Sequence, residues 1–197
     1  MNKIKLVFAT QNANKLKEIQ ASLGEAFELI SLADLNFFDD IPETAHTFEE
    51  NALIKAKTIF AKFNLPCFAD DSGLEVAALN GEPGVYSARY AGEPKNDEAN
   101  YLKLLQKLKD ITTRDANFKT IIAFVGPIGE FTFEGTIKGQ ILNEPIGENG
   151  FGYDPVFQPD GHNQSFAQMS IDEKKGISHR AIAFKKFVNF INRESQK

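Results

Sequence analysis

Apolar and polar residues follow two different periodicities along the chain, and these periodicities predict its first elements. Short apolar runs at 4–9 and 27–31 predict two strands. Between them, apolar residues at helical spacing predict a helix that ends near Leu23, just before Gly24. The polar segment Thr10–Lys15 therefore opens a helix directly after a strand.

A capping box marks the start of the clearest helix in the chain. Thr47 and Glu50 form the box, and the helix predicted after them covers 48–63. Its expected buried stripe is Leu53, Ala56, Phe60 and Phe63. Three polar residues, Glu50, Asn51 and Lys55, lie off that stripe. An exposed, solubilising lysine is the usual interpretation of a residue such as Lys55 at this position.

Further along, the pattern predicts a helix, a β-hairpin and a last helix. Residues 97–109 have acids in the first turn and lysines in the last, which is typical of a structural amphipathic helix. The runs 118–125 and 131–142 flank a Gly-Pro-Ile-Gly turn and predict a long hairpin. A second capping box, Ser170–Glu173, precedes the last helix, which opens after Ile177.

Two carboxylates follow the third apolar run directly. The segment 65–69 leads into Asp70, Asp71, Ser72 and Gly73, which predicts a strand that ends in two acids and a tight turn. Ligands of open α/β sheets bind at such strand ends. Because successive strand side chains point to opposite faces, the two acids are expected to have different roles. A plain polar turn is the alternative interpretation.

The loop Thr10–Lys15 has the layout of an anion-binding site. A strand, a polar loop and a helix start present backbone N–H groups and the positive end of the helix dipole, and Lys15 adds a charge. The alternative is that Asn12 or Asn14 only caps the helix. The glycines of a phosphate-binding P-loop are missing.

Two further segments suggest contacts to a flat, polar ligand. Glycines flank Phe151 in the loop Gly147–Pro155, so its ring could stack on a base; the alternative is a hairpin turn with the ring folded inward. His179 and Arg180 stand in the first turn of the last helix, where the helix dipole disfavours cations. Such a broken local rule suggests an anionic or acceptor-rich ligand.

Composition limits the classes of function. The 197 residues carry a net charge of −5, which argues against general binding to nucleic acids. Because no run approaches 18 apolar residues and the N-terminus is short and charged, neither a membrane span nor a signal peptide is expected. Cys67 is the single cysteine, which fits a reducing cytoplasm, and its apolar neighbours favour a core role. Three separated histidines argue against zinc.

Lysines, acids and an aromatic ring together indicate a nucleotide phosphate bound with a divalent metal. Mg²⁺ is held in such sites by one or two carboxylates with phosphate oxygens and water. The candidate acids are Glu43, Asp70 and Asp71, and the candidate cations are Lys15, Lys55, Lys174, His179 and Arg180.

Six blocks of sequence resemble, in order, the motifs of the inosine/xanthosine triphosphate pyrophosphatase family. They span nearly the whole chain and are Thr10–Lys15 with Glu18, Glu43 with Thr47–Ala52 and Lys55, Phe68–Val76, Gly84–Gly92, Gly150–Pro155, and Ser178–Arg180 after Lys174. Three positions depart from the family's pattern. Gln11 replaces a common glycine, and Ala77 and Gln168 replace frequent acids, which leaves the secondary metal carboxylates open.

The resemblance implies an α/β fold with an elongated mixed β-sheet flanked by helices, in two lobes with a central cleft, forming one domain over residues 1–197. It implies hydrolysis of ITP, dITP and XTP to the monophosphate and pyrophosphate, a Mg²⁺ requirement and a homodimer. By position, Asp71 matches the catalytic carboxylate and binds the metal with Glu43. Residues that match triphosphate contacts are Thr10, Gln11, Asn12, Ala13, Asn14, Lys15 and Lys55. Residues that match nucleoside contacts are Ser72, Phe151, Gly152, Tyr153, Asp154, Lys174, His179 and Arg180.

Base selection has a chemical rationale under this resemblance. Inosine and xanthine carry a keto oxygen where adenine has an amino group, so donors from His179 or Arg180 would favour them, by as much as ~10⁴-fold. Two alternatives stay open. One is a related pyrophosphatase of modified pyrimidine or canonical nucleotides, and the other is a nucleotide-binding module without catalysis.

Overall fold

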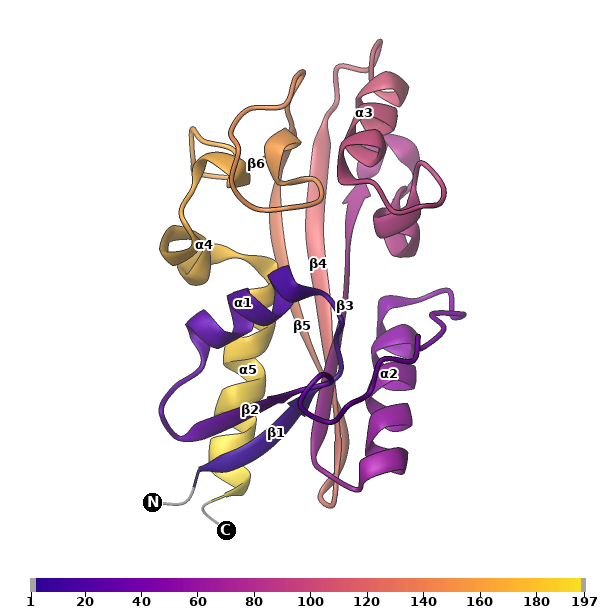
Figure 1. Ribbon diagram of the computed structural model, residues 1–197. Coiled ribbons are helices and arrows are strands. Elements are labelled where there is room, and N and C mark those ends of the chain that lie inside the picture. Colours follow the sequence, from indigo (N-terminus) through magenta and orange to yellow (C-terminus); the bar gives the residue numbers. More distant parts are fainter. Residues whose placement is uncertain (1–2, 196–197) are drawn as a thin grey trace. The chain divides into compact units, whose positions relative to one another are not determined.

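The computed structural model describes residues 3–195, which form an α/β arrangement (Figure 1). Its helices are α1 (Ala13–Ser22), α2 (Phe48–Phe63), α3 (Asp97–Lys107), α4 (Ile171–Ile177) and α5 (His179–Glu194). Its strands are β1 (Ile4–Phe8), β2 (Phe27–Ser31), β3 (Cys67–Val76), β4 (Asp115–Gly126), β5 (Gly129–Ile141) and β6 (Phe157–Pro159). The elements predicted from the periodicity are therefore present. Among residues 3–195, no helix is both long and apolar enough to cross a membrane.

The strands form a mixed sheet in the order β2-β1-β3-β4-β5-β6. β1 runs parallel to β2 and to β3, whereas β6 is antiparallel to β5. This confirms the expected mixed sheet. The chain also divides into two compact units, one made of 1–71, 120–135 and 180–197, and the other of 72–119 and 136–179. We call them unit 1 and unit 2. That they act as one domain around a cleft stays a prediction.

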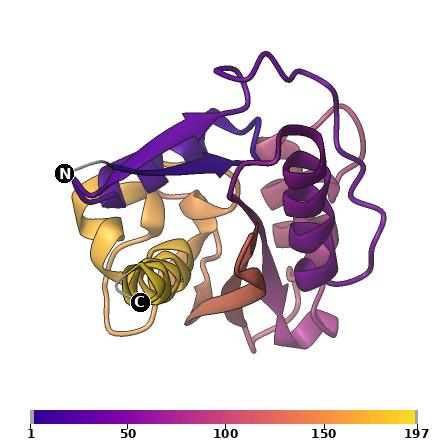
Figure 2. The ribbon, with the colours of Figure 1, turned by 90° about the horizontal axis from the view of Figure 1, so that it is seen from below.

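Unit 1 has helices on both sides of its strands. Figure 2, which looks along α5, shows α5 on one side of the strands and α2 on the other. The α5 side has an aromatic core in which the rings of Phe8 and Phe68 stack with centroids 4.6 Å apart, and Phe184 and Phe187 from α5 pack on Phe68. Because strand side chains alternate, the residues next to Phe8 and Phe68 in their strands face the other side, toward α2. Cys67 is one of them and is fully buried, which confirms its core role.

The helix α2 buries a different stripe from the one predicted. Its buried residues are Phe48, Asn51, Ala52, Lys55, Ala56 and Ile59, whereas Leu53, Phe60 and Phe63 are only half-buried. The interpretation of Lys55 as an exposed lysine was therefore wrong. Two alanines let α2 approach the sheet closely, and carboxylates on that side give the buried lysine its partners. Burial of a charge requires such pairing.

The two acids lie in the middle of β3 and not at its end. β3 continues as extended backbone from Cys67 to Val76, so the predicted turn at Asp70–Gly73 was wrong. The nearest strand end belongs to β1, whose last pair with β3 is Phe8 with Phe68. Asp70 and Asp71 therefore stand just beyond the carboxyl end of β1, where open sheets bind ligands. Charged residues are rare in strands, which is why sequence reasoning placed a turn here.

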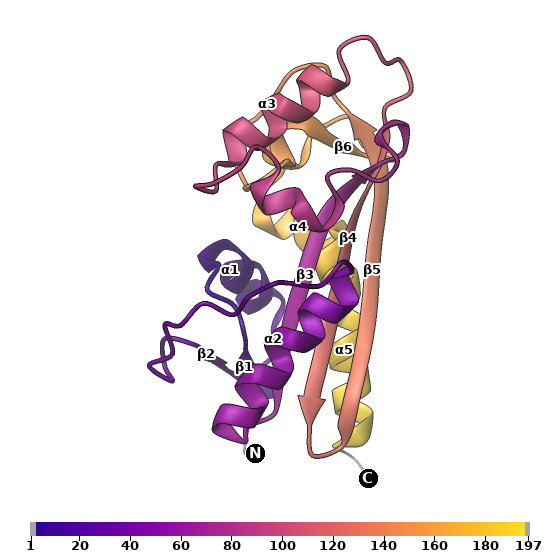
Figure 3. The same cartoon turned by 90° about the vertical axis from the view of Figure 1, so that its right-hand side faces the viewer.

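Unit 2 has its own core, built from β3, β4, α3 and the segment after β5. α3 lies beside the turn 84–89 (Figure 3), where buried Asn100 donates to the carbonyl of Ala88 and accepts from the N–H of Ala91. The ring of Phe118 contacts those of Phe157 and Phe166. The glycine-rich loop before β6 is hydrogen-bonded to this core, through Gly152 to Asp97 and through Tyr153 to the Ser87 carbonyl.

Candidate active site

In unit 1, the loop after β1 caps the start of α1. The Asn12 side chain accepts from the N–H groups of Asn14 (2.9 Å) and Lys15 (3.2 Å), so Asn12 is the helix cap. The Asn12 N–H in turn donates to the Thr10 hydroxyl. Gln11 donates to the carbonyls of Phe38 and Asp39, which ties this loop to the acidic loop that follows β2. Residues 11–14 are exposed and accessible to a ligand.

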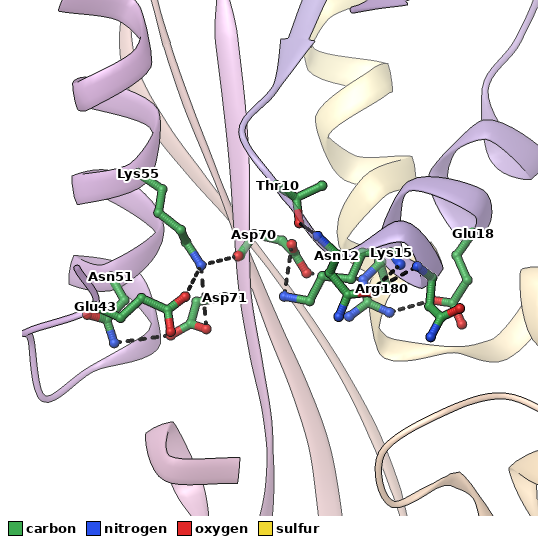
Figure 4. A network of polar contacts seen from close by, with 11 residues as sticks. Thr10, Asn12, Lys15, Glu18, Glu43, Asn51, Lys55, Asp70, Asp71 and Arg180 are labelled. Atoms are coloured by element: carbon green, nitrogen blue, oxygen red, sulfur yellow. Dashed lines mark hydrogen bonds and ion pairs between the residues drawn. The ribbon is translucent and has the colours of Figure 1, made fainter. Parts of the chain in front are cut away.

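Asp70 faces α1 and α5 and meets two cations (Figure 4). Its Oδ1 lies 3.1 Å from the Lys15 ammonium, and its Oδ2 accepts from the Arg180 Nε at 3.1 Å. Arg180 also donates to Glu18 on α1. Arg180 is buried, and these carboxylates neutralise the charge that the start of α5 disfavours. The unfavourable position of Arg180 at the positive end of the α5 dipole is thus offset by carboxylates of the protein itself.

Asp71 faces α2 and has a different set of partners (Figure 4). Its Oδ2 accepts from the Asn51 amide at 3.2 Å, and its Oδ1 lies 3.7 Å from the Lys55 ammonium. The same ammonium donates to Glu43 and to the Asp70 carbonyl, both at 2.6 Å. The expectation that the two acids point to opposite faces is therefore confirmed. Asp71 belongs to a network with Glu43, and Asp70 belongs to a network with Arg180.

Burial shifts the protonation of these groups in informative directions. Desolvation raises the pKa of Asp71, although Lys55 and Lys15 oppose the shift, so Asp71 is a stronger base than an ordinary aspartate. Burial lowers the pKa of Lys15, with Asp70 as the main opposing charge. Burial also acts to lower the pKa of Lys55, but attraction to Asp71, Glu43 and Asp70 outweighs it and raises that pKa.

Glu43 and Asp71 have the chemistry of a magnesium site. Their two carboxylates share one lysine, which leaves a net charge of −1 in this network (one Lys, two acids). Within residues 3–195, no group of three or more His, Cys, Asp or Glu residues is placed to hold a metal. A metal here would thus rely on two carboxylates with phosphate oxygens and water, which is the coordination that Mg²⁺ favours. The residues present fit that ion.

In unit 2, the glycine-rich loop is held by a buried ion pair. The Lys174 ammonium lies 2.7 Å from Asp154 Oδ2, and the same oxygen accepts from the Phe151 N–H at 2.9 Å. Lys174 also lies over the half-buried Phe151 ring, 5.6 Å from its centroid. The Gly152 N–H donates to Asp97 on α3. The loop is therefore a fixed surface with a partly exposed ring and a lysine beneath it.

Of three other predicted nucleoside contacts of unit 2, Tyr153 and His179 are buried and Ser72 is half-buried. Tyr153 is buried, and its hydroxyl donates to the Ser87 carbonyl; burial raises the pKa of Tyr153. The His179 ring stacks on Phe118 with centroids 4.7 Å apart and planes within 8°. Ser72 is half-buried in β3. Tyr153 is thus engaged in the core, and His179 is held by one face of its ring.

The structure gathers the predicted residues into one set in each unit. Unit 1 brings together Thr10, Asn12, Lys15, Glu43, Lys55, Asp71 and Arg180, around Asp70 and Asp71. Unit 2 brings together Phe151, Asp154 and Lys174. Sequence reasoning missed the roles of Asn51, Glu18 and Asp97. A signal existed for Asn51, which lies one helical turn before Lys55 and so shares its face.

The fold and the unit 1 network define an α/β protein in which two adjacent carboxylates of β3 each pair with a lysine, Asp70 with Lys15 and Asp71 with Lys55. The chain belongs to the Ham1 family, whose model matches residues 6–190. This confirms the resemblance drawn from the sequence blocks.

Curated relatives cover nearly the whole chain. The dITP/XTP pyrophosphatase of Flavobacterium psychrophilum is 50% identical over 187 residues, which is 95% of this chain and 98% of that protein. The dITP/XTP pyrophosphatase of Porphyromonas gingivalis is 50% identical over 188 residues, 95% of this chain and 97% of that protein. Among solved structures, the Staphylococcus aureus Ham1 protein superposes with a TM-score of 0.88 at 43% identity, covering 96% of this chain and 99% of that one.

Proposed function

We propose that this protein hydrolyses non-canonical purine nucleoside triphosphates, such as ITP, dITP and XTP, to the monophosphate and pyrophosphate. Relatives named dITP/XTP pyrophosphatase, about half identical over nearly the full length, support this substrate class. The observation that carries the reaction is Lys55, which lies between Glu43 and Asp71 on the α2 side of β3. The protein is therefore a hydrolase of acid anhydrides that removes such nucleotides from the pool.

The residues around Asp70 and Asp71 have complementary tasks in this proposal. The exposed start of α1 with Lys15 binds the triphosphate, because backbone N–H groups and a lysine favour anions. Lys55 stabilises the negative charge that develops on the leaving pyrophosphate as the α–β anhydride bond breaks. Asp71 accepts the proton of the attacking water, since its raised pKa makes it a better base at neutral pH.

We assign the metal role to Mg²⁺, held by Glu43 and Asp71. When bound, Mg²⁺ would neutralise phosphate charge and orient the triphosphate. Asn51 keeps one oxygen of Asp71 in place, so the other oxygen stays available beside Lys55.

The unit 2 residues are proposed to contact the nucleoside. Phe151 offers a flat apolar face, and stacking of a base on an aromatic ring contributes roughly 1–3 kcal/mol. Lys174 and His179 can donate to keto oxygens, which are present on inosine and xanthine and absent at position 6 of adenine. Ser72 and the loop Gly152–Asp154 complete the unit 2 set; Arg180, which the resemblance also assigns to the nucleoside, belongs to unit 1.

A product assay with a nucleotide panel tests the proposal. The purified protein is incubated with Mg²⁺ and with ITP, dITP, XTP, GTP, ATP and UTP, and the products are resolved chromatographically. We expect pyrophosphate and the monophosphate from the first three, with much slower turnover of the rest. Orthophosphate as the first product, or a preference for UTP or ATP, would contradict the proposal. Binding of ITP without turnover would instead support a binding module.

The role of Asp71 is tested separately. Asp71→Asn keeps the size and one acceptor oxygen of the side chain but removes its basicity, so kcat should fall by at least about a hundredfold. Wild-type turnover by this variant would refute the assignment.

We further propose a homodimer, as the resemblance implies, in the reducing cytoplasm that the single cysteine fits. Analytical ultracentrifugation should give about twice the chain's mass of 21.9 kDa.

A further inference from the structure

We propose that Asp70 is a positioning residue that holds Lys15 in place for the triphosphate, and that it is neither the base nor a metal ligand. The inference rests on the proposed function and deepens it, because it separates the roles of two neighbouring aspartates. It follows from three observations on unit 1.

The first observation is that both oxygens of Asp70 contact cations of the protein itself. Oδ1 lies 3.1 Å from Lys15, and Oδ2 accepts from the Arg180 Nε at 3.1 Å. Asp70 is 1% exposed. The charge of this buried carboxylate is thus compensated by cations of the protein on its own face of β3, whereas Asp71 points to the other face, toward Glu43.

The second observation is that Arg180 has two carboxylate partners. Glu18 and Asp70 both contact it, so the four charges of Lys15, Arg180, Glu18 and Asp70 sum to zero. Asp70 is thus anchored by an arginine that has a second carboxylate of its own. The other oxygen of Asp70 can hold Lys15 without adding uncompensated negative charge to a site for an anion.

The third observation concerns Lys15 itself. Its side chain is long and flexible, so holding it in one geometry costs rotamer entropy. The contact with Asp70 restricts the lysine before any ligand binds, which reduces the entropy lost on binding. Burial lowers the pKa of Lys15; Asp70 and Asp71 oppose this, while Lys55 and Arg180 add to it. Asp70 is the largest of the opposing charges, so it acts to raise the pKa of Lys15 against the effect of burial.

The chain provides a matched control for the experiment. Asp70→Asn and Glu18→Gln each remove one carboxylate charge from Arg180, but only Asp70→Asn removes the partner of Lys15. Binding of inorganic pyrophosphate is measured by isothermal titration calorimetry without metal. We expect Asp70→Asn to weaken this binding about tenfold, and Glu18→Gln to leave it within twofold of the native protein. Native-like or tighter binding by Asp70→Asn would overturn the proposal.

Two further measurements separate positioning from other roles. Mg²⁺ affinity, measured by calorimetry without nucleotide, should be unchanged in Asp70→Asn, and a large loss would make Asp70 a metal ligand. The alkaline limb of kcat/KM should move to lower pH in Asp70→Asn but not in Glu18→Gln, because Lys15 loses its main opposing charge. A limb that stays in place would contradict the role of Asp70.

A double variant and a conservative variant complete the test. In a Lys15→Met background, Asp70→Asn should weaken pyrophosphate binding no further, since the residue acts through Lys15. Additive losses would contradict the proposal. If Asp70→Asn does not fold, Asp70→Glu keeps the charge for Arg180 and shifts the carboxylate, and it should still weaken pyrophosphate binding. Because every one of these binding readouts is independent of turnover, they remain decisive even if the panel assay refutes the proposed reaction.

Discussion

Asp70 and Asp71 are neighbours in sequence but have different partners. Asp70 meets Lys15 and Arg180, whereas Asp71 meets Lys55 and Asn51. This divergence was predictable, because strand geometry sends successive side chains to opposite faces. Which cation meets which acid was not predictable, because Arg180 lies 110 residues further along the chain from Asp70.

Asn51 is a buried polar residue of α2. It is 1% exposed, donates to Asp71 and exchanges hydrogen bonds with the backbone of Ala45. It therefore links Asp71 to the loop that carries Glu43. The sequence placed Asn51 off the apolar stripe of its helix, and only the packing of α2 shows that it is buried.

We predict that Asn51→Leu lowers kcat by about tenfold or more, because the isosteric leucine no longer fixes Asp71. Loss of these buried hydrogen bonds should also lower the free energy of unfolding by about 1–3 kcal/mol. Asn100→Leu is the matched control, since Asn100 is equally buried and also bonds to the backbone, but in unit 2. It should lose similar stability and keep its kcat. Steady-state kinetics and urea denaturation measure both, and equal kcat losses would contradict the role of Asn51.

At the scale of elements, β3 and α2 together create the unit 1 network. β3 continues through its two acids as extended strand, and α2 presents a face that mixes alanines with Asn51 and Lys55. The periodicity predicted α2 and the first part of β3, but it ended the strand at its two acids and assigned α2 a neighbouring face. Hydrophobic spacing could not find the true face, because the buried polar residues are stabilised by partners on β3.

The glycine-rich loop of unit 2 permits a test at the same scale. Gly150 has φ +79°, and an added Cβ would lie 2.0 Å from Asp154 Oδ2. Gly150→Ala should therefore displace Asp154 from Lys174 and raise KM for ITP by about tenfold. Gly161 has the same φ of +79° and no heavy atom within 4 Å of such a Cβ.

Gly161→Ala is thus a control for backbone strain alone. Both variants should lose stability of about 1–2 kcal/mol from the left-handed conformation, measured by thermal denaturation. Only Gly150→Ala should change KM, and equal KM values for the two variants would contradict the role given to Asp154.

At the scale of the whole molecule, each unit has a separate hydrophobic core, and buried charges interrupt the core of unit 1 beside β3. Buried charges lower stability unless their partners compensate for lost solvation. Proteins retain such groups where chemistry needs them. We therefore expect the unit 1 network to reduce the stability of the metal-free protein.

The stability of the metal-free protein should depend on Asp71 in a defined pH range. Desolvation raises the folded-state pKa of Asp71 above its ordinary value of 3.8. Between 3.8 and the raised value, the folded state binds more protons than the unfolded state, so the free energy of unfolding contributed by Asp71 falls as pH rises. Above the raised pKa the loss is complete. Asp71→Asn lacks this loss and should be the more stable protein at neutral pH.

Urea denaturation in EDTA, repeated from about pH 4 to about pH 8, measures the difference in the free energy of unfolding between the native protein and Asp71→Asn. A raised carboxyl pKa titrates within this range. The advantage of the variant should grow with pH and then level off. A difference that is constant with pH would show that Asp71 ionises in the folded protein as it does in the unfolded chain.

From the sequence alone one could predict most of the helices and strands, the family and the charged residues of the site. These follow from local periodicity, capping and ordered motifs, which are properties of short segments. The tertiary structure decided that β3 continues through its acids, that Lys55 and Asn51 are buried, and that Asp70 is bound to Arg180. Burial and Coulomb attraction act between segments distant in sequence, so their outcome depends on how the chain packs. For this reason Asp70 gained its proposed role only from the fold.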